Sequence, residues 1–232
     1  MNYDQIITEL YARSDPKVVD YKRHKYGIQA ENALGIYHKE LKEMARLIPK
    51  DNSLAMQLFD SGIYEGRLLC SKIFNPKDLT DVIMEKWVVT FENWEICDSF
   101  SMGLFAKGDL AIAKIKEWTT RPEEFQKRAG FATLAAYCMA DKTSSNEVFE
   151  QFLPLIEREV IDDRIYVKKA VNWSLRSIGK RNRDLNKASI ICAKRILEID
   201  DKTAKWIASN ALKELQRSDV RISDYPRKIY RA

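Results

Sequence analysis

The chain has 232 residues, of which 45% are hydrophobic and 31% charged, and this balance is that of a soluble globular protein rather than a disordered one. Lys and Arg number 39 against 34 Asp and Glu, a net charge of +5 that permits nucleic-acid binding without requiring it. Only 8 glycines and 6 prolines punctuate the chain, too few for a turn-rich sandwich or barrel, so we expect an all-α protein.

The sequence also disfavours several classes of protein. No apolar run approaches the roughly 20 residues that span a bilayer, and the N-terminus lacks the pattern of a signal peptide, so we expect a cytoplasmic protein without a membrane partner. His24 and His38 are the only histidines, and we expect neither a metal site nor a cofactor. The cysteines form no CxxC pair and favour buried free thiols over disulfides or a zinc site: they are Cys70, Cys97, Cys138 and Cys192.

In chain order, the first expected helix carries an apolar stripe from Tyr3 to Leu10. Asp15 and Pro16 then end it and start a second helix, since Asp is a good N-cap and Pro suits the first helical turn. Residues 25–35 are less regular, and helices resume at about 37–49, 53–61 and 64–74.

Beyond Phe74 the turn signals become periodic, which is the main architectural feature of the sequence. They predict helical pairs of about 35 to 40 residues, a length typical of HEAT or armadillo repeats. The expected helices run from 76 to 91 and on to 105, from 109 to 141 in two parts, over 146–161 and 163–182, and over 183–199 and 201–217. We therefore expect one curved domain over residues 1–232, an α-α superhelix of stacked HEAT-like helical pairs with a concave basic surface, acting as a monomer.

Trp173 stands out in the expected helix 163–182 because it lies away from the apolar stripe. At about 100° per residue, it is about 200° from Val171 and from Leu175. Its neighbours at offsets of minus four, plus three and plus seven are all cations: Lys169, Arg176 and Lys180. Cations neutralise phosphates and an aromatic face packs on sugar or base, so this row suits nucleic acid. The alternative is a tryptophan buried between adjacent repeats, beside an ordinary solvated face.

The stretch FENWEICDSF, residues 91–100, places Trp94 and Asp98 one helical turn apart. In the expected helix 122–141, Arg128 is surrounded by small residues, which either admit a ligand or simply pack against another repeat. Trp94, Arg128 and Trp173 all fall on the second helix of successive pairs, and equivalent helices line one surface of a repeat array. We expect that surface to be rimmed by cations: Lys127, Lys169, Arg176, Lys180, Arg181 and Lys213.

These residues resemble a known family. Trp94-x-x-x-Asp98, then the segment 125–129 (FQKRA) and the segment 167–176 (VKKAVNWSLR) are similar to motifs of the AlkD-type DNA alkylation repair family of helical-repeat DNA glycosylases. The similarity covers about the C-terminal two thirds of the chain. Asn93 departs from the family pattern, in which an aromatic residue often precedes the tryptophan.

The resemblance implies hydrolysis of the N-glycosidic bond of cationic N3- and N7-alkylated purines in duplex DNA, without metal or cofactor. It implies that Asp98 is the catalytic carboxylate, that Trp94 and Trp173 pack on the deoxyribose of the lesion, and that Arg128 holds nearby backbone. Two other hypotheses stay open. The chain could bind damaged or branched DNA without catalysis, or it could be a HEAT-type protein-interaction scaffold; the carboxylate one turn from Trp94 favours catalysis.

Overall fold

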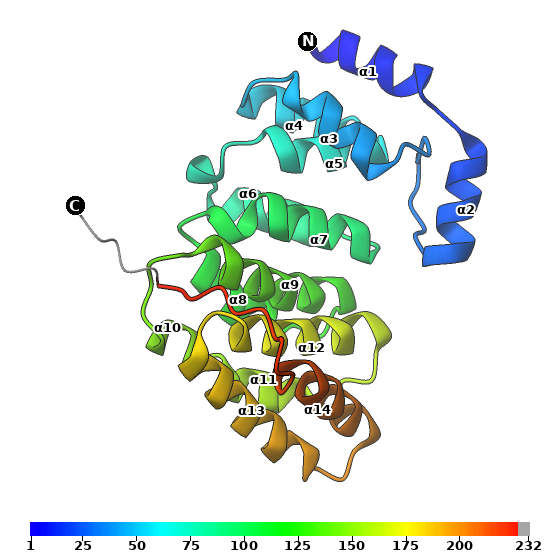
Figure 1. Cartoon of the computed structure of the whole chain (residues 1–232). Coiled ribbons are helices and arrows are strands. Elements are labelled where there is room, and N and C mark those ends of the chain that lie inside the picture. The colour runs from blue at the N-terminus through cyan, green and yellow to red at the C-terminus, as the bar shows by residue number, and fades with distance from the viewer. Residues whose placement is uncertain (227–232) are drawn as a thin grey trace. The chain divides into compact units, whose positions relative to one another are not determined.

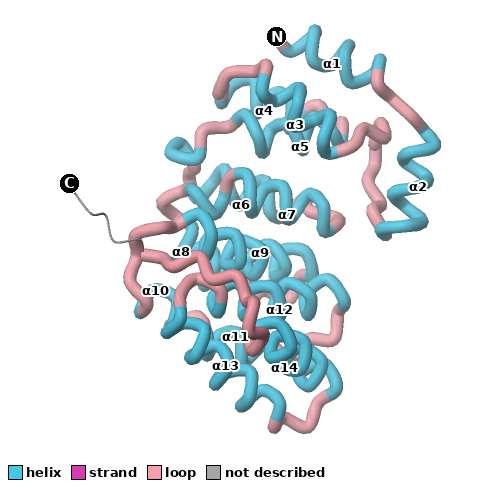
Figure 2. The backbone as a smooth tube through the Cα atoms, viewed as in Figure 1, coloured by secondary structure: helices cyan, strands magenta, loops and turns pink. Residues whose placement is uncertain are grey.

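The computed structural model describes residues 1–226, and every regular element among them is a helix (Figures 1 and 2). The all-α prediction is confirmed. Contacts group the chain into two compact units, Met1–Leu110 and Ala111–Ala232, which are described in turn. The single domain and the concave surface stay predictions. Within residues 1–226, no helix combines the length and apolar character needed to cross a bilayer.

The first unit consists of short helices that follow the predicted punctuation (Figure 1). They are α1 (Tyr3–Ala12), α2 (Pro16–Tyr26), α3 (His38–Arg46), α4 (Asn52–Asp60), α5 (Tyr64–Ile73), α6 (Asp81–Val88) and α7 (Trp94–Gly103), with the 3₁₀ turns η1 (Pro76–Asp78) and η2 (Phe105–Lys107). Asp15 caps α2 as expected, accepting a hydrogen bond from the Lys17 amide at 2.9 Å. Helix α5 packs against α3, α4 and α7 and so forms the centre of the unit.

Aromatic side chains from several helices fill the core of this unit. Trp87 on α6 is fully buried, and its ring centroid lies 5.1 Å from that of Phe74 and 5.2 Å from that of Phe100. Such edge-to-face pairs stabilise by roughly 0.5–1.5 kcal/mol beyond their burial. Because Phe100 belongs to α7, this packing fixes the rotation of the helix that carries Trp94 and Asp98.

The irregular segment between α2 and α3 is held by one buried carboxylate. Glu65 on α5 is fully buried and accepts hydrogen bonds from the backbone amides of Leu34, Gly35 and Ile36 at 2.8, 2.9 and 3.2 Å. Gly35 has φ of +83°, and a Cβ there would lie 2.2 Å from the Asp15 carbonyl oxygen. The glycine therefore allows the loop to lie directly on the start of α2.

The second unit shows the helical pairs more clearly. Its helices are α8 (Ala111–Trp118), α9 (Glu124–Ala140), α10 (Glu147–Glu150), α11 (Leu153–Glu159), α12 (Ile165–Gly179), α13 (Arg183–Leu197) and α14 (Lys202–Leu215). α8 packs on α9, α11 on α12 and α13 on α14, while α12 lies between α9 and α14. The second helices of successive pairs are thus neighbours, as the HEAT-like prediction requires.

Two predicted helices are interrupted in the structure. The expected helix 76–91 begins as the turn η1, and Thr80 then caps a new helix at Asp81 by accepting from the Ile83 amide at 3.3 Å. The expected helix 146–161 is split into α10 and α11, with Pro154 in the first turn of α11. A proline has no amide hydrogen to donate, so a helix starts at it more readily than it runs through it.

Candidate nucleic-acid interface

Helix α7 begins at a residue that is anchored on several sides. The side-chain oxygen of Asn93 accepts hydrogen bonds from the amides of Glu95 and Ile96 at 2.9 and 3.2 Å, which caps the helix. Its side-chain nitrogen donates to the Gln29 carbonyl at 3.2 Å, and the Tyr64 hydroxyl lies 3.0 Å from its oxygen. The position where an aromatic residue is frequent in the resembled family therefore serves here as a helix cap.

Trp94 is the first residue of α7 and is held against α2. Its indole Nε1 donates to the Tyr26 carbonyl at 2.9 Å, and the ring stays half-exposed. One residue later, Glu95 forms a buried ion pair with Lys22 of α2, with 2.8 Å between Oε2 and Nζ. The orientation of Trp94 thus depends on the docking of α2.

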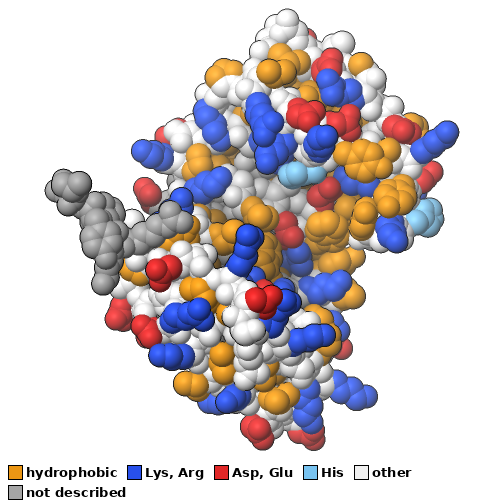
Figure 3. All heavy atoms as spheres, in the orientation of Figure 1, with side chains coloured by type: hydrophobic (Ala, Val, Ile, Leu, Met, Phe, Trp, Pro, Cys, Tyr) orange, Lys and Arg blue, Asp and Glu red, His pale blue; other side chains and the backbone are white. Residues whose placement is uncertain are grey.

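Asp98 follows one turn along α7, half-buried, and lines a groove of about 650 Å³ within the first unit. Trp94, Glu95, Ser99 and Met102 belong to the wall on the same helix. The other walls come from α3 and the loop after it, the end of α5 and η2, and they carry basic side chains: His38, Lys42, Arg46, Lys50, Lys72 and Lys107. Figure 3 shows Lys and Arg side chains and a histidine gathered over α3 and α5.

The basic groups of this groove perturb one another. Burial lowers the pKa of Lys72 to about 8; the negative charge of Glu95 opposes this shift, and the positive charges of Lys42 and Lys107 add to it. Burial, followed by the charge of Lys72, lowers the pKa of His38 below its usual 6.5. The pKa of Lys50 is lowered by burial and by Lys107. Cations crowded in this way favour the arrival of an anion, which would relieve their repulsion.

In the second unit, Arg128 on α9 is buried, with 6% of its surface exposed. One guanidinium nitrogen donates to the Tyr166 carbonyl at 2.7 Å, which fastens α9 to the start of α12. Its small neighbours serve packing, because a Cβ on Gly130 would lie 2.7 Å from the Thr119 amide nitrogen. Arg128 therefore has a structural contact of its own, which the sequence did not indicate.

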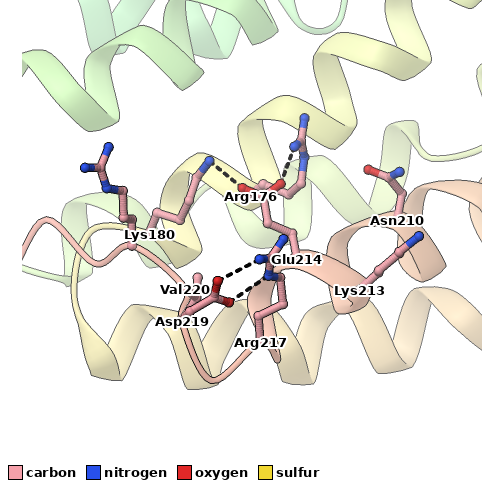
Figure 4. A pocket seen from close by; sticks show the side chains of 9 residues that line it. Arg176, Lys180, Asn210, Lys213, Glu214, Arg217, Asp219 and Val220 are labelled. Atoms are coloured by element: carbon pink, nitrogen blue, oxygen red, sulfur yellow. Dashed lines mark hydrogen bonds and ion pairs between the residues drawn. The ribbon is translucent and has the colours of Figure 1, made fainter.

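Three of the predicted phosphate ligands are engaged by carboxylates. Lys127 lies 2.6 Å from a Glu159 oxygen, while Glu214 pairs with Lys180 at 2.7 Å and with Arg176 (Figure 4). These last residues line a groove of about 990 Å³ at α14, where Lys213 has no ion pair within the described part of the chain. The cationic row beside Trp173 is thus partly neutralised.

Arg181 does not fit its predicted role as a DNA ligand. Only 1% of its surface is exposed, and its guanidinium donates to the carbonyls of Cys138 and Asp141 at 2.5 and 2.6 Å. The group also lies 3.6 Å from the ring centroid of Phe149. A phosphate has no access to it, and its contacts indicate that it joins α9, α10 and the end of α12.

Trp173 is half-exposed on α12, whereas Val171 and Leu175 are fully buried, as the helical geometry predicted. Lys169 is exposed. Trp173, Lys169 and Lys213 are therefore the predicted site residues of the second unit that remain open to a ligand. The described residues contain no cluster of three or more His, Cys, Asp or Glu suited to a metal ion.

The basic side chains of the first unit were missed in the sequence, although a signal was present. His38, Lys42 and Arg46 recur every four residues along α3 and are exposed, whereas Leu41 and Met44 are buried. This recurrence is the same kind of signal as the cations spaced around Trp173 along α12. Lys50 and Lys72 carry no such pattern, because their shared groove depends on the tertiary structure.

The fold and the groove define a class: an all-helical protein of stacked HEAT-like pairs, with an aromatic and a carboxylate on the wall of a basic groove. Residues 6–215 match the family model described as DNA alkylation repair enzyme, and the chain belongs to this family. The resemblance to the DNA alkylation repair family that the sequence indicated is confirmed.

Two individual proteins illustrate the relationship. The uncharacterized protein Lin0241 of Listeria innocua is 28% identical over 138 residues, which are 56% of this chain and 60% of that protein. A solved structure, described as a new family of proteins related to the HEAT-like repeat DNA glycosylases with affinity for branched DNA structures, superposes with a TM-score of 0.76. The match covers 98% of this chain and 100% of that chain at 17% identity, and it shows the fold.

Proposed function

We propose that the protein is a DNA glycosylase that hydrolyses the N-glycosidic bond of cationic N3- and N7-alkylated purines in duplex DNA, with Asp98 as the catalytic carboxylate. One observation carries this proposal. Helix α7 places Trp94 and Asp98 one turn apart on the wall of a groove whose other walls are basic. Membership in the DNA alkylation repair family supports it.

The proposed reaction needs only one carboxylate beside the sugar. An alkylated purine already carries a positive charge and leaves without being protonated, so no general acid is needed. As the bond breaks, positive charge develops on the deoxyribose, and a carboxylate beside the sugar stabilises this oxocarbenium-like transition state. The same oxygen atoms can orient the attacking water. The crowded cations around Asp98 attract the phosphates that flank the lesion.

The aromatic side chains would pack on the sugar of the lesion. Trp94 is suited to this role because its Nε1 is already bonded to Tyr26, which fixes the ring while leaving it half-exposed. Trp173 and Lys169 are proposed as DNA contacts in their own right, on the face of α12 that is open to a ligand. Arg128 acts indirectly in this proposal, by fastening the start of the helix that carries Trp173.

The experiment is incubation with duplex DNA containing N7-methylguanine, scoring the free base. Wild type should release it, Asp98→Asn should release far less, and Asp109→Asn should match wild type because Asp109 is exposed and outside the groove. Equal release by wild type and Asp98→Asn, or none by wild type, would contradict the proposal.

A second candidate is a repeat protein that binds branched DNA without excising bases. The similar structure with affinity for branched DNA favours it, and so does α2. This helix exposes Tyr21 and Tyr26 next to Arg23, His24 and Lys25, which is a combination suited to unpaired bases and phosphates. Tighter binding to a four-way junction than to duplex, together with no base release, would select this candidate.

A further inference from the structure

Lys72 differs from three other lysines whose side chains are at most 12% exposed. Lys22, Lys114 and Lys127 lie 2.8, 2.7 and 2.6 Å from carboxylate oxygens. The Lys72 Nζ instead lies 3.3 Å from the Nε2 of His38, and it makes no ion pair with any residue between 1 and 226. An imidazole does not hold an ammonium in its charged form as a carboxylate does.

The surroundings of Lys72 keep its amine reactive. Burial, with smaller contributions from Lys42 and Lys107, lowers its pKa to about 8 against the opposing charge of Glu95. Roughly a tenth of such an amine is uncharged at about pH 7, whereas an ordinary lysine with a pKa of about 10.4 is uncharged in only about four molecules per ten thousand. An uncharged lysine amine is the nucleophile that attacks carbonyl carbons.

The Lys72 amine also lies in the groove where the proposed reaction takes place. Lys72 lines the same groove as Trp94 and Asp98, where the proposed reaction leaves an abasic deoxyribose. The ring-opened form of that sugar carries an aldehyde at C1′. A nucleophilic amine, a carboxylate and phosphate-binding cations are thereby gathered around one aldehyde.

We propose that Lys72 forms an imine with C1′ of an abasic site held in this groove, which gives the protein an abasic-site lyase activity. The Lys72 nitrogen attacks C1′, and the resulting carbinolamine loses water. The Asp98 carboxylate then acts as the base and takes a proton from C2′; Glu95, the other carboxylate that lines the groove, is paired with Lys22. The electron pair forms a C2′=C3′ double bond, the C3′–O bond breaks and the 3′ phosphate departs; water then hydrolyses the imine and restores the amine.

This inference uses the groove assigned under the proposed function but does not require excision of an alkylated base, because abasic DNA can be supplied ready-made. A duplex with one uracil, treated with a uracil-DNA glycosylase, provides the substrate. Sodium borohydride reduces any imine to a stable secondary amine, so that protein and DNA become covalently joined.

Wild type should give a borohydride-dependent adduct, and peptide mass spectrometry should place it on Lys72. Lys72→Ala should lose the adduct, and so should Lys72→Arg, which keeps a positive charge for phosphates but cannot form an imine. Lys39→Ala, on the exposed position after His38, should behave as wild type. The yield should rise as the pH passes about 8, where the Lys72 amine loses its proton.

No adduct with wild type, an adduct on another lysine, or an undiminished yield with Lys72→Arg would overturn the inference. Circular dichroism of each variant separates these results from misfolding. Release of N7-methylguanine without trapping would refute the lyase and leave the proposed glycosylase standing. Trapping without release of the alkylated base would do the opposite.

Discussion

The buried ion pair between Lys22 and Glu95 connects α2 to the helix of the candidate site, and its removal is the first test of the structure. The two side chains are only 8% and 11% exposed, with 2.8 Å between Nζ and Oε2. Lys22→Met leaves Glu95 buried with the Tyr64 hydroxyl, 3.0 Å away, as its remaining partner. Isolating one charge of a buried pair costs about 3–5 kcal/mol.

The double variant Lys22→Met/Glu95→Gln should regain much of this loss and fall within about 2 kcal/mol of wild type, since neither charge is then stranded. Lys205 and Asp200 offer a matched exposed pair, 2.7 Å apart and with side chains 49% and 99% exposed. Lys205→Met should cost at most about 1 kcal/mol.

Urea unfolding followed by circular dichroism measures these differences, with all variants compared in one buffer. A loss for Lys22→Met no larger than that for Lys205→Met would refute the argument that this pair holds α2 in place. The argument would also be refuted if the stability loss of the double variant equalled the sum of the losses of Lys22→Met and Glu95→Gln measured singly, because residues in contact are expected to be coupled.

Three further outcomes follow from the structure. Lys72 should destabilise the fold at neutral pH, since its pKa of about 8 lies below the usual 10.5 and the unfolded chain therefore binds more protons between these values. Lys72→Met should stabilise by about 1–3 kcal/mol at pH below about 8, and urea titrations should show that gain vanishing as the pH rises to about 10.5. Gly35→Ala should lower the melting temperature strongly, because its Cβ would lie 2.2 Å from the Asp15 carbonyl oxygen, whereas Gly62→Ala, also at positive φ but with its nearest contact 3.9 Å away at Asn32 Nδ2, should lower it less. The buried cysteines, among them Cys138 whose pKa burial raises to about 12, should react with a thiol reagent only after unfolding; stoichiometric labelling of the native protein would contradict their burial.

Local signals in the sequence were sufficient for most of the architecture. Caps such as Asp15 with Pro16, and the periodic turns beyond Phe74, gave the order and approximate bounds of the helices. The errors lie where a single residue restarts a helix. Thr80 and Pro154 each lie at the start of a new helix inside a stretch whose apolar periodicity continues. Periodicity alone does not show where one helix ends and the next begins in a new direction.

The residues of the candidate site were harder to predict from the sequence than the helices were. Helical angles placed Trp173 correctly off the buried stripe, but they could not show that Glu214 pairs with Arg176 and Lys180 from another helix. Nor could they show that Arg181 is enclosed by backbone carbonyls. A cation on a polar face is a candidate ligand only until tertiary structure brings it a partner.

The departure at Asn93 illustrates the opposite case. In the sequence it was only a mismatch with a family pattern, whereas in the structure it caps α7 and bonds to the Gln29 carbonyl. Asn93 therefore has a structural role at the start of the helix that carries Trp94 and Asp98. It does not displace Asp98 from the groove wall.

The central claim is that Asp98 stabilises positive charge on the sugar of an alkylated nucleotide, and single-turnover release of N7-methylguanine tests it most directly. A carboxylate about 4–5 Å from a developing unit charge contributes about 3–4 kcal/mol at an effective dielectric constant of about 20. At about 1.4 kcal/mol per factor of ten, Asp98→Asn should release the base about 10²–10³ times more slowly than wild type. Asp109→Asn should keep the wild-type rate. An Asp98→Asn variant that is correctly folded and as fast as wild type would contradict the account.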